Sequence, residues 1–241
     1  YYGGLLGSIE LAKAHGFYTS YPSSPTSEGI LQYDLWNITQ PETINGLLDW
    51  NDLKLQMKRY GLRNSLITAV MPTASTSQIL GNYECIEPIT SNIFTRNTLA
   101  GNFIVINKYL IDDLNKLGLW NDEMKDKIIF NKGSVQNIEE IPSNIKRKYK
   151  TIWELKQKII IDMAIDRSPY ICQSQSMNIY LDDPSKLYKC HIYAWEHGLK
   201  TGCYYFKTKP ASDPTPFSLG DKFISSSSKC KNDEVCTFCS A

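Results

Sequence analysis

Long apolar runs are missing from this sequence of 241 residues. No window approaches about 18 consecutive apolar residues, so no segment has the composition of a membrane-spanning helix. An excess of either charge is missing too, because 26 basic residues face 25 acidic residues and the formal net charge is +1. Such a balance gives no general attraction to polyanions or to membrane surfaces. We therefore expect neither nucleic acid nor membrane as a partner.

A dense cysteine framework and a secretory signal are also lacking. The number of cysteines is odd, and the positions are scattered: Cys85, Cys172, Cys190, Cys203, Cys230, Cys236 and Cys239. We therefore expect a reducing, cytoplasmic compartment, and we interpret the first three cysteines as buried, small apolar residues. No pair of the three histidines has metal-ligand spacing near carboxylates or thiols, so we expect no metal in this chain.

Apolar spacing predicts alternating helices and strands, and hence an α/β fold. Predicted helices cover residues 1–15, 47–60, 109–117, 122–130, 143–166 and 184–198. Predicted strands cover residues 65–71, 174–181 and 202–208, and the two prolines of residues 21–29 predict a loop without a regular element. Residues 209–241 contain few core-forming side chains, so we expect a main domain over residues 1–208 and a flexible tail after it.

Hydroxyl residues crowd the end of the predicted strand 65–71, where Thr73, Ala74, Ser75, Thr76 and Ser77 follow Pro72. A helix that begins here exposes unpaired N–H groups and the positive end of its dipole, which favours an anion such as a phosphate. The capping-box spacing of Ser75 and Gln78 supports a helix start. An ordinary N-cap whose hydroxyls serve only their own backbone is the alternative.

Two adjacent phenols, Tyr204 and Tyr205, occur in the predicted strand 202–208. Stacked phenols could relay an electron and a proton. Tyrosine is also common in strands, so two side chains that point to opposite faces are the alternative.

The tail ends in a Cys-x-x-Cys motif formed by Cys236 and Cys239. Two thiols at this spacing suit thiol–disulfide exchange. A zinc site that adds Cys230 is the competing interpretation, but a closed structural site needs a fourth ligand and the nearby sequence supplies none.

Several of these segments together resemble the large subunit of class I ribonucleoside-diphosphate reductases. The resemblance covers essentially the whole chain in order. The segments that carry it are residues 63–82 (RNSLITAVMPTASTSQILGN), 87–92 (EPITSN), 29–34 (GILQYD), 173–178 (QSQSMN), 198–205 (GLKTGCYY) and the terminal CTFC.

The resemblance implies the C-terminal half of a ten-stranded α/β barrel, in an enzyme that reduces ribonucleoside diphosphates at the 2′ position. It implies that residues 73–77 hold the substrate diphosphate, that Tyr204 and Tyr205 relay a radical, and that Cys236 and Cys239 re-reduce the active site. The implied partners are a small subunit with a metal-radical cofactor, and thioredoxin or glutaredoxin. An oligomer is also expected, and the helix over residues 184–198 is expected to take the small subunit's C-terminal peptide.

The family's thiyl cysteine and nucleotide effector sites match no residue of this chain. The sequence also does not begin with Met. We therefore expect the C-terminal part of a longer protein, inactive alone, whose ATP and deoxynucleotide effectors bind the absent part. In this chain itself we expect no cofactor. Met is expected where Cys203 stands, and Cys230 has no clear role. A non-catalytic nucleotide-phosphate-binding module and a stand-alone thiol oxidoreductase are the alternative functions.

Overall fold

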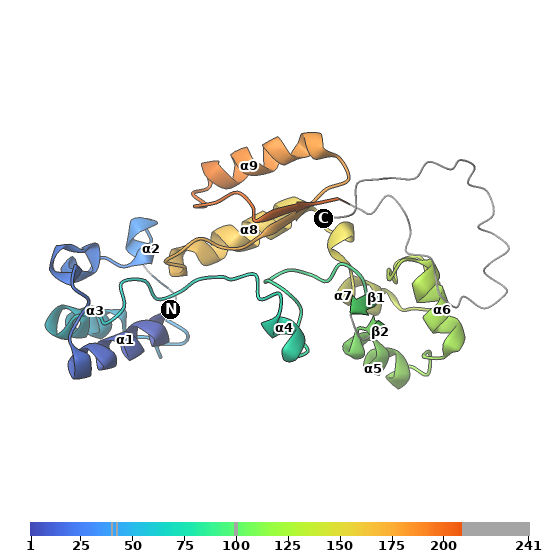
Figure 1. Ribbon diagram of the computed structural model, residues 1–241, viewed down its shortest axis with the longest axis horizontal. Helices are drawn as coiled ribbons and strands as arrows, with labels where there is room; N and C mark the ends of the chain where they lie inside the picture. The colour runs from blue at the N-terminus through green and yellow to red at the C-terminus, as the bar shows by residue number, and fades with distance from the viewer. Residues whose placement is uncertain (40, 42, 99–100, 209–241) are drawn as a thin grey trace. The chain divides into compact units, whose positions relative to one another are not determined.

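A computed structural model describes residues 1–39, 41, 43–98 and 101–208 of the chain (Figure 1). These residues form two compact units: the first contains Tyr1–Glu87 and residues 155–208, and the second contains Pro88–Glu154. Within the described residues, each unit contains helices and one two-stranded sheet. The presence of both element types in one chain agrees with the predicted α/β class.

The N-terminal part of the first unit is built on two helices, α1 (Tyr2–His15) and α3 (Trp50–Tyr60). Both end at glycines with positive φ, Gly16 at 76° and Gly61 at 78°, a conformation that glycine adopts without steric cost. Helix α3 begins three residues later than predicted, because the Asp49 carboxylate accepts a hydrogen bond from the Asp52 N–H and caps the helix there. Their apolar faces share a core that contains Leu5, Ile9, Tyr21, Leu31, Tyr33, Trp50, Leu53, Met57 and Leu62.

Residues 21–29 are more regular than the sequence predicts. Two short 3₁₀ helices, η1 (Tyr21–Ser23) and η2 (Pro25–Glu28), replace the predicted loop. Each proline lies in the first turn of its helix, where a missing N–H costs nothing because no intrahelical acceptor faces it. The short helix α2 (Gln32–Leu35) follows, and its Asp34 carboxylate forms an ion pair with Lys54 at 2.8 Å.

The predicted buried strand over residues 65–71 is wrong. These residues run extended, but they form only an isolated parallel bridge within the described residues, between Val70 and Gln175. The Leu66 and Met71 side chains are 54% and 64% exposed. An apolar run is buried only where other elements cover both of its faces, and here its hydrogen-bonded neighbour lies on one side.

The rest of the first unit contains a short parallel sheet. Strand β3 (Asn178–Tyr180) pairs with β4 (Tyr205–Lys207), with Asn178 opposite Tyr205 and Tyr180 opposite Lys207. These strands lie within the two segments predicted to be strands. Helices α8 (Gln157–Arg167) and α9 (Leu187–Glu196) lie side by side (Figure 1). A 3₁₀ turn, η5 (Pro184–Lys186), precedes α9, so the predicted helix over residues 184–198 is confirmed in its main part.

The predicted single helix over residues 143–166 is wrong, because the chain breaks between α7 (Ser143–Lys148) and α8. At the break the Thr151 N–H donates to the Glu154 carboxylate at 2.7 Å, and the Ile152 N–H donates to the Ile89 carbonyl at 2.9 Å. Because these N–H groups have partners outside a helix, the chain forms a 3₁₀ turn here, η3 (Ile152–Glu154), in place of a continuous α-helix.

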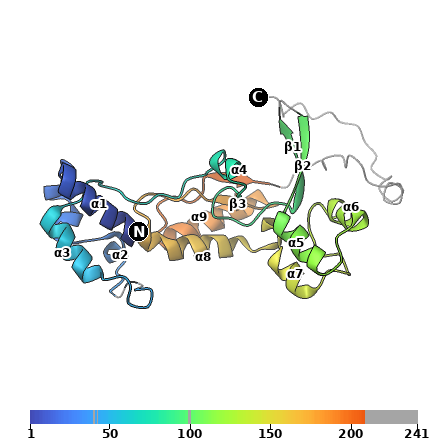
Figure 2. The ribbon, with the colours of Figure 1, turned by 90° about the horizontal axis from the view of Figure 1, so that it is seen from below.

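The second unit contains a β-hairpin that the sequence did not predict. Strands β1 (Ile93–Thr98) and β2 (Gly101–Ile106) are antiparallel, and Figure 2 shows them side by side. Helices α5 (Lys108–Lys116) and α6 (Asp122–Phe130) follow close to the predicted positions, each capped by the side chain of the preceding asparagine. The core of this unit contains Ile93, Leu110, Leu114, Met124, Ile128, Val135, Ile138, Ile141, Ile145 and Tyr149.

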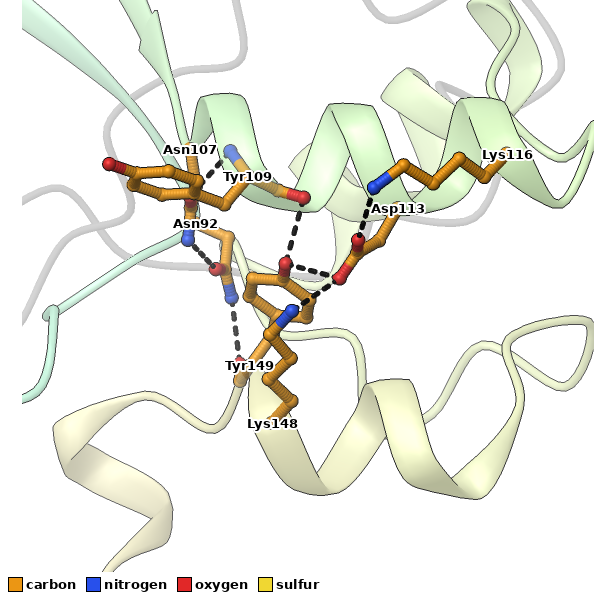
Figure 3. Close-up of polar contacts among 7 residues, drawn as sticks. All are labelled: Asn92, Asn107, Tyr109, Asp113, Lys116, Lys148 and Tyr149. Carbon is orange, nitrogen blue, oxygen red and sulfur yellow. Dashed lines mark hydrogen bonds and ion pairs between the residues drawn. The ribbon is translucent and has the colours of Figure 1, made fainter.

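A polar network joins the hairpin of the second unit to α5 and α7 (Figure 3). The fully buried Asn92 donates from Nδ2 to the carbonyls of Gly133 and Tyr149 at 3.0 and 2.9 Å, and it accepts from Asn107 Nδ2 at 3.0 Å. The Asp113 carboxylate lies 2.6 Å from Lys148 Nζ and 2.7 Å from the Tyr149 hydroxyl. Hydrogen bonds from Lys148 and Tyr149 lower the pKa of Asp113 from 3.8 to about 2.

Candidate functional site

The hydroxyl segment, residues 73–77, lies in the first unit, in a tight turn that leads into the four-residue helix α4 (Thr76–Ile79). Thr73 has a φ of 52°, and its carbonyl accepts a hydrogen bond from the Ser77 N–H at 2.9 Å. The predicted capping box is wrong: the Ser75 side chain forms no capping bond, and Gln78 Nε2 donates to Glu84 at 3.3 Å. The Ser75 backbone is already in the right-handed helical region, unlike the extended backbone typical of an N-cap.

The hydroxyl groups of this segment are therefore not used as helix caps. Ala74, Ser75 and Thr76 are exposed. The side chain of Ser77 is 4% exposed, and its Oγ has no hydrogen-bond partner within the described residues. A buried hydroxyl without a partner costs about 1–3 kcal/mol, so native proteins usually supply one, either from the protein or from a bound molecule.

Cys85 connects the hydroxyl segment to strand β3. Its backbone N–H lies 3.2 Å from both the Pro72 carbonyl and Thr73 Oγ1, and its φ is 57°. On the other side, Asn178 Nδ2 lies 3.7 Å from Cys85 Sγ. Burial, followed by the charge of Glu87, raises the pKa of the Cys85 thiol, so this sulfur is neutral at physiological pH.

The tyrosine pair, Tyr204 and Tyr205, lies at the start of β4. The two ring centroids are 4.3 Å apart, and the ring planes meet at 64°, an edge-to-face contact. The Tyr204 N–H donates to the Met177 carbonyl at 2.6 Å, which joins the pair to the residue before β3. A hydrogen bond to Tyr205 raises the pKa of the Tyr204 phenol. Both side chains are about half exposed, at 50% and 56%, so the rings contact each other at the surface of the unit.

Comparisons with known proteins agree with one another. The family model described as "Ribonucleotide reductase, barrel domain" matches residues 1–205. This chain belongs to the ribonucleotide reductase family. It is similar to the ribonucleoside-diphosphate reductase large chain of Cryptosporidium parvum, with 51% identity over 96% of this chain and 29% of the relative. It is also similar to the ribonucleoside-diphosphate reductase large subunit of variola virus, with 53% identity over 100% of this chain and 31% of the relative.

A solved structure of a ribonucleotide reductase is also similar to this chain in its fold. The class Id ribonucleotide reductase alpha subunit of Actinobacillus ureae matches with a TM-score of 0.54 and 26% sequence identity, over 92% of this chain and 36% of that chain. The chain thus spans about 30% of the length of the curated relatives named above. Within the described residues, no helix combines the length and the apolar character needed to cross a membrane.

The cysteines of this reductase-family chain are less buried than predicted. Cys85, Cys172 and Cys190 are half-buried, and their thiols are free, as is that of Cys203. Cys203 Sγ lies 3.7 Å from His191 Nε2, and burial raises the pKa of this thiol. The three remaining cysteines, Cys230, Cys236 and Cys239, lie outside the described residues, so the thiol-exchange motif stays a prediction.

Sequence reasoning gave no role to Glu87, Asn178 and Tyr180, although the first two lie in the segments that carry the reductase resemblance. The Glu87 carboxylate accepts hydrogen bonds from both of the other residues. One signal was present in the sequence: residues 178 and 180 share one face of a strand, because strand side chains alternate with a period of two. Nothing in the pattern showed that an acidic side chain 91 residues earlier meets that face.

Proposed function

We propose that this chain is the C-terminal part of the barrel of a class I ribonucleoside-diphosphate reductase large subunit, with residues 209–241 as a redox tail. The enzyme removes the 2′-hydroxyl of a ribonucleoside diphosphate as water while a dithiol is oxidised to a disulfide. The product is a deoxyribonucleoside diphosphate, a precursor for DNA synthesis. Relatives at about 50% identity, named as large subunits of this reductase, support the proposal.

The observation that carries the proposal is the contact between the rings of Tyr204 and Tyr205, 4.3 Å apart at their centroids. Phenols in contact can pass a hydrogen atom from one oxygen to the other without a charged intermediate. In this proposal they relay a radical from a metal-radical cofactor in the small subunit. The small subunit's C-terminal peptide docks along α9, where Tyr188 and Trp195 expose 72% and 73% of their surfaces.

The hydroxyl segment is proposed to hold the substrate diphosphate. Exposed Ser75 and Thr76 offer hydroxyl donors, and buried Ser77 has a hydroxyl that still needs a partner within the described residues. The Cys85 backbone holds the segment beside β3, so the substrate site and the tyrosine pair belong to one compact unit. Ala74 takes part through its backbone alone, because its side chain has no donor.

The remaining parts of the proposal concern groups beyond the described residues. Cys236 and Cys239 re-reduce the active-site disulfide, and thioredoxin or glutaredoxin recharges them. ATP and deoxynucleotide effectors bind the part of the large subunit that precedes the matched region. The enzyme works in the cytoplasm as an oligomer with its small subunit.

A reconstituted enzyme tests this function. The complete large subunit that contains this chain is mixed with its small subunit and thioredoxin, and CDP reduction is measured. Tyr205→Phe should abolish turnover and leave CDP binding intact, because only the hydroxyl that carries the hydrogen atom is lost. Tyr109→Phe, which removes a hydroxyl from an exposed tyrosine of the second unit, is the matched control and should retain turnover. Turnover by Tyr205→Phe overturns the relay, and CDP binding without any reduction by the wild type favours a non-catalytic binding module.

A further inference from the structure

The Glu87 carboxylate accepts hydrogen bonds from the backbone and side chain of Asn178 and from the side chain of Tyr180, both in strand β3. Oε1 accepts from the Asn178 backbone N–H at 2.7 Å. Oε2 accepts from Asn178 Nδ2 at 3.1 Å and from the Tyr180 hydroxyl at 2.9 Å. Asn178 and Tyr180 are only 3% and 4% exposed and Glu87 is half-buried, so these bonds are partly shielded from water. Charge-assisted hydrogen bonds of this kind are roughly twice as strong as neutral ones, and together they fix the strand to Glu87.

Strand β3 in turn determines where the tyrosine pair lies. Strand β4 has three residues, and within the described part of the chain β3 is the strand that pairs with it. Asn178, which Glu87 holds through both its backbone and its side chain, is paired directly with Tyr205. The phenols are about half exposed, so side-chain packing restrains them little and the backbone of β4 sets their position.

The same cluster reaches the hydroxyl segment. Asn178 Nδ2, which donates to Glu87, also lies 3.7 Å from Cys85 Sγ. The backbone N–H of Cys85 is 3.2 Å from the hydroxyl oxygen of Thr73. A continuous path of contacts therefore runs from Thr73 through Cys85 and Asn178 to the strand that carries Tyr205.

We propose that Glu87 is a positioning residue that holds β3, and through it the Tyr204 and Tyr205 phenols, in register for radical transfer. The inference rests on the proposed reductase function. Glu87 does not contact substrate or the reacting atoms in this proposal. Its effect is geometric, and a misplacement of about 1 Å in a reacting group can cost about 100-fold in rate.

Glu87→Gln is the informative substitution, because it keeps the side-chain volume and removes one acceptor. The amide oxygen can still accept from the Asn178 N–H, but the amide NH₂ replaces the oxygen that accepts from Asn178 Nδ2 and from the Tyr180 hydroxyl, so both donors lose their charged acceptor. We expect kcat for CDP reduction to fall about 10- to 100-fold, while KM for CDP changes less than about twofold. A purely structural role would lower the amount of folded enzyme and leave the kcat of the folded fraction unchanged.

Glu84→Gln is the matched control, since Glu84 lies in the same loop and its carboxylate accepts from Gln78, which is not part of β3. It should retain the wild-type kcat. Tyr180→Phe removes one of the donors to Glu87, so we expect a loss of kcat of a few fold. The double variant Glu87→Gln with Tyr180→Phe should lose no more than Glu87→Gln alone, because both changes act on one cluster.

The outcomes separate the two proposals. If the wild type and Glu84→Gln reduce CDP but Glu87→Gln does so at the wild-type kcat, the positioning role is wrong and the reductase function stands. Additive losses in the double variant also overturn the positioning role. If the wild type itself fails to reduce CDP, the reductase function fails. Circular dichroism and thermal unfolding of each variant establish the folded fraction to which each kcat refers.

Discussion

Replacing Gln175 by alanine should release the extended segment that leads into the hydroxyl segment. The Gln175 side chain is 9% exposed and ties the end of α8 to this segment. Its Nε2 donates to the Ala164 carbonyl at 2.7 Å and to Ser168 Oγ at 2.9 Å, and its Oε1 accepts from Arg167 Nε at 3.1 Å. Its backbone forms the parallel bridge to Val70.

The expected loss follows from these three hydrogen bonds. Each of the two bonds to neutral acceptors contributes about 1 kcal/mol, and the bond from the Arg167 guanidinium contributes about 2 kcal/mol. Ala164 keeps a partner after the substitution, because Ser168 Oγ also donates to its carbonyl at 2.8 Å, so the bond to Ala164 is left out of the loss. We therefore expect Gln175→Ala to lower the free energy of unfolding by about 3 kcal/mol, which corresponds to about a 100-fold change in the unfolding equilibrium.

Urea unfolding and amide hydrogen exchange measure this effect. The Ser176 N–H, which donates to the Val70 carbonyl at 2.8 Å, should exchange up to about 100-fold faster in Gln175→Ala, since the bond opens with the segment. Gln173→Ala is the control, because Gln173 lies two residues before Gln175 in the same segment, residues 173–178, but its side chain is exposed. It should change stability by less than about 0.5 kcal/mol. Equal stability of the two variants, with the Ser176 amide still protected, would refute the reasoning.

Three further predictions concern the second unit and the tail. Asn92→Ala removes three buried hydrogen bonds and should destabilise the protein by about 3 kcal/mol in urea unfolding; a change below about 1 kcal/mol would contradict the role of this network. Because Lys148 and Tyr149 hold the folded-state pKa of Asp113 at about 2, below the ordinary 3.8, the stability that Asp113 contributes should be fully present above about pH 5 and be lost as the pH falls toward 2. Asp113→Asn should flatten this part of the acid unfolding curve, and superimposable curves for the two proteins would disprove it. Cys239→Ser should permit one turnover but block thioredoxin-driven cycling, since a single thiol cannot form the disulfide; undiminished multiple turnover would exclude the tail mechanism.

Local signals in the sequence predicted most of the helices. Apolar spacing together with terminal glycines located α1 and α3, and α5 and α6 were placed within about one residue. These features are encoded within a few residues of the chain, because capping and amphipathic periodicity are local properties. The order of motifs also indicated the family, which the comparisons confirm.

Features that depend on distant partners were mispredicted or missed. The apolar spacing of residues 143–166 indicated one helix, but the Ile152 N–H bonds to the carbonyl of Ile89, and the helix breaks there. Residues 65–71 have the composition of a buried strand, yet burial requires neighbours that cover both faces. The hairpin of β1 and β2 was missed because its pairing register is a property of two strands together.

The sequence by itself determined the residue types on which the proposed chemistry depends: hydroxyls at 73 and 75–77, adjacent phenols at 204 and 205, and thiols at 236 and 239. Only the tertiary structure decided that the two phenols meet edge to face and that Glu87 bonds to the strand beside them. The physical reason is that a hydrogen bond between residues 91 positions apart depends on the path of the whole chain, which no local pattern specifies.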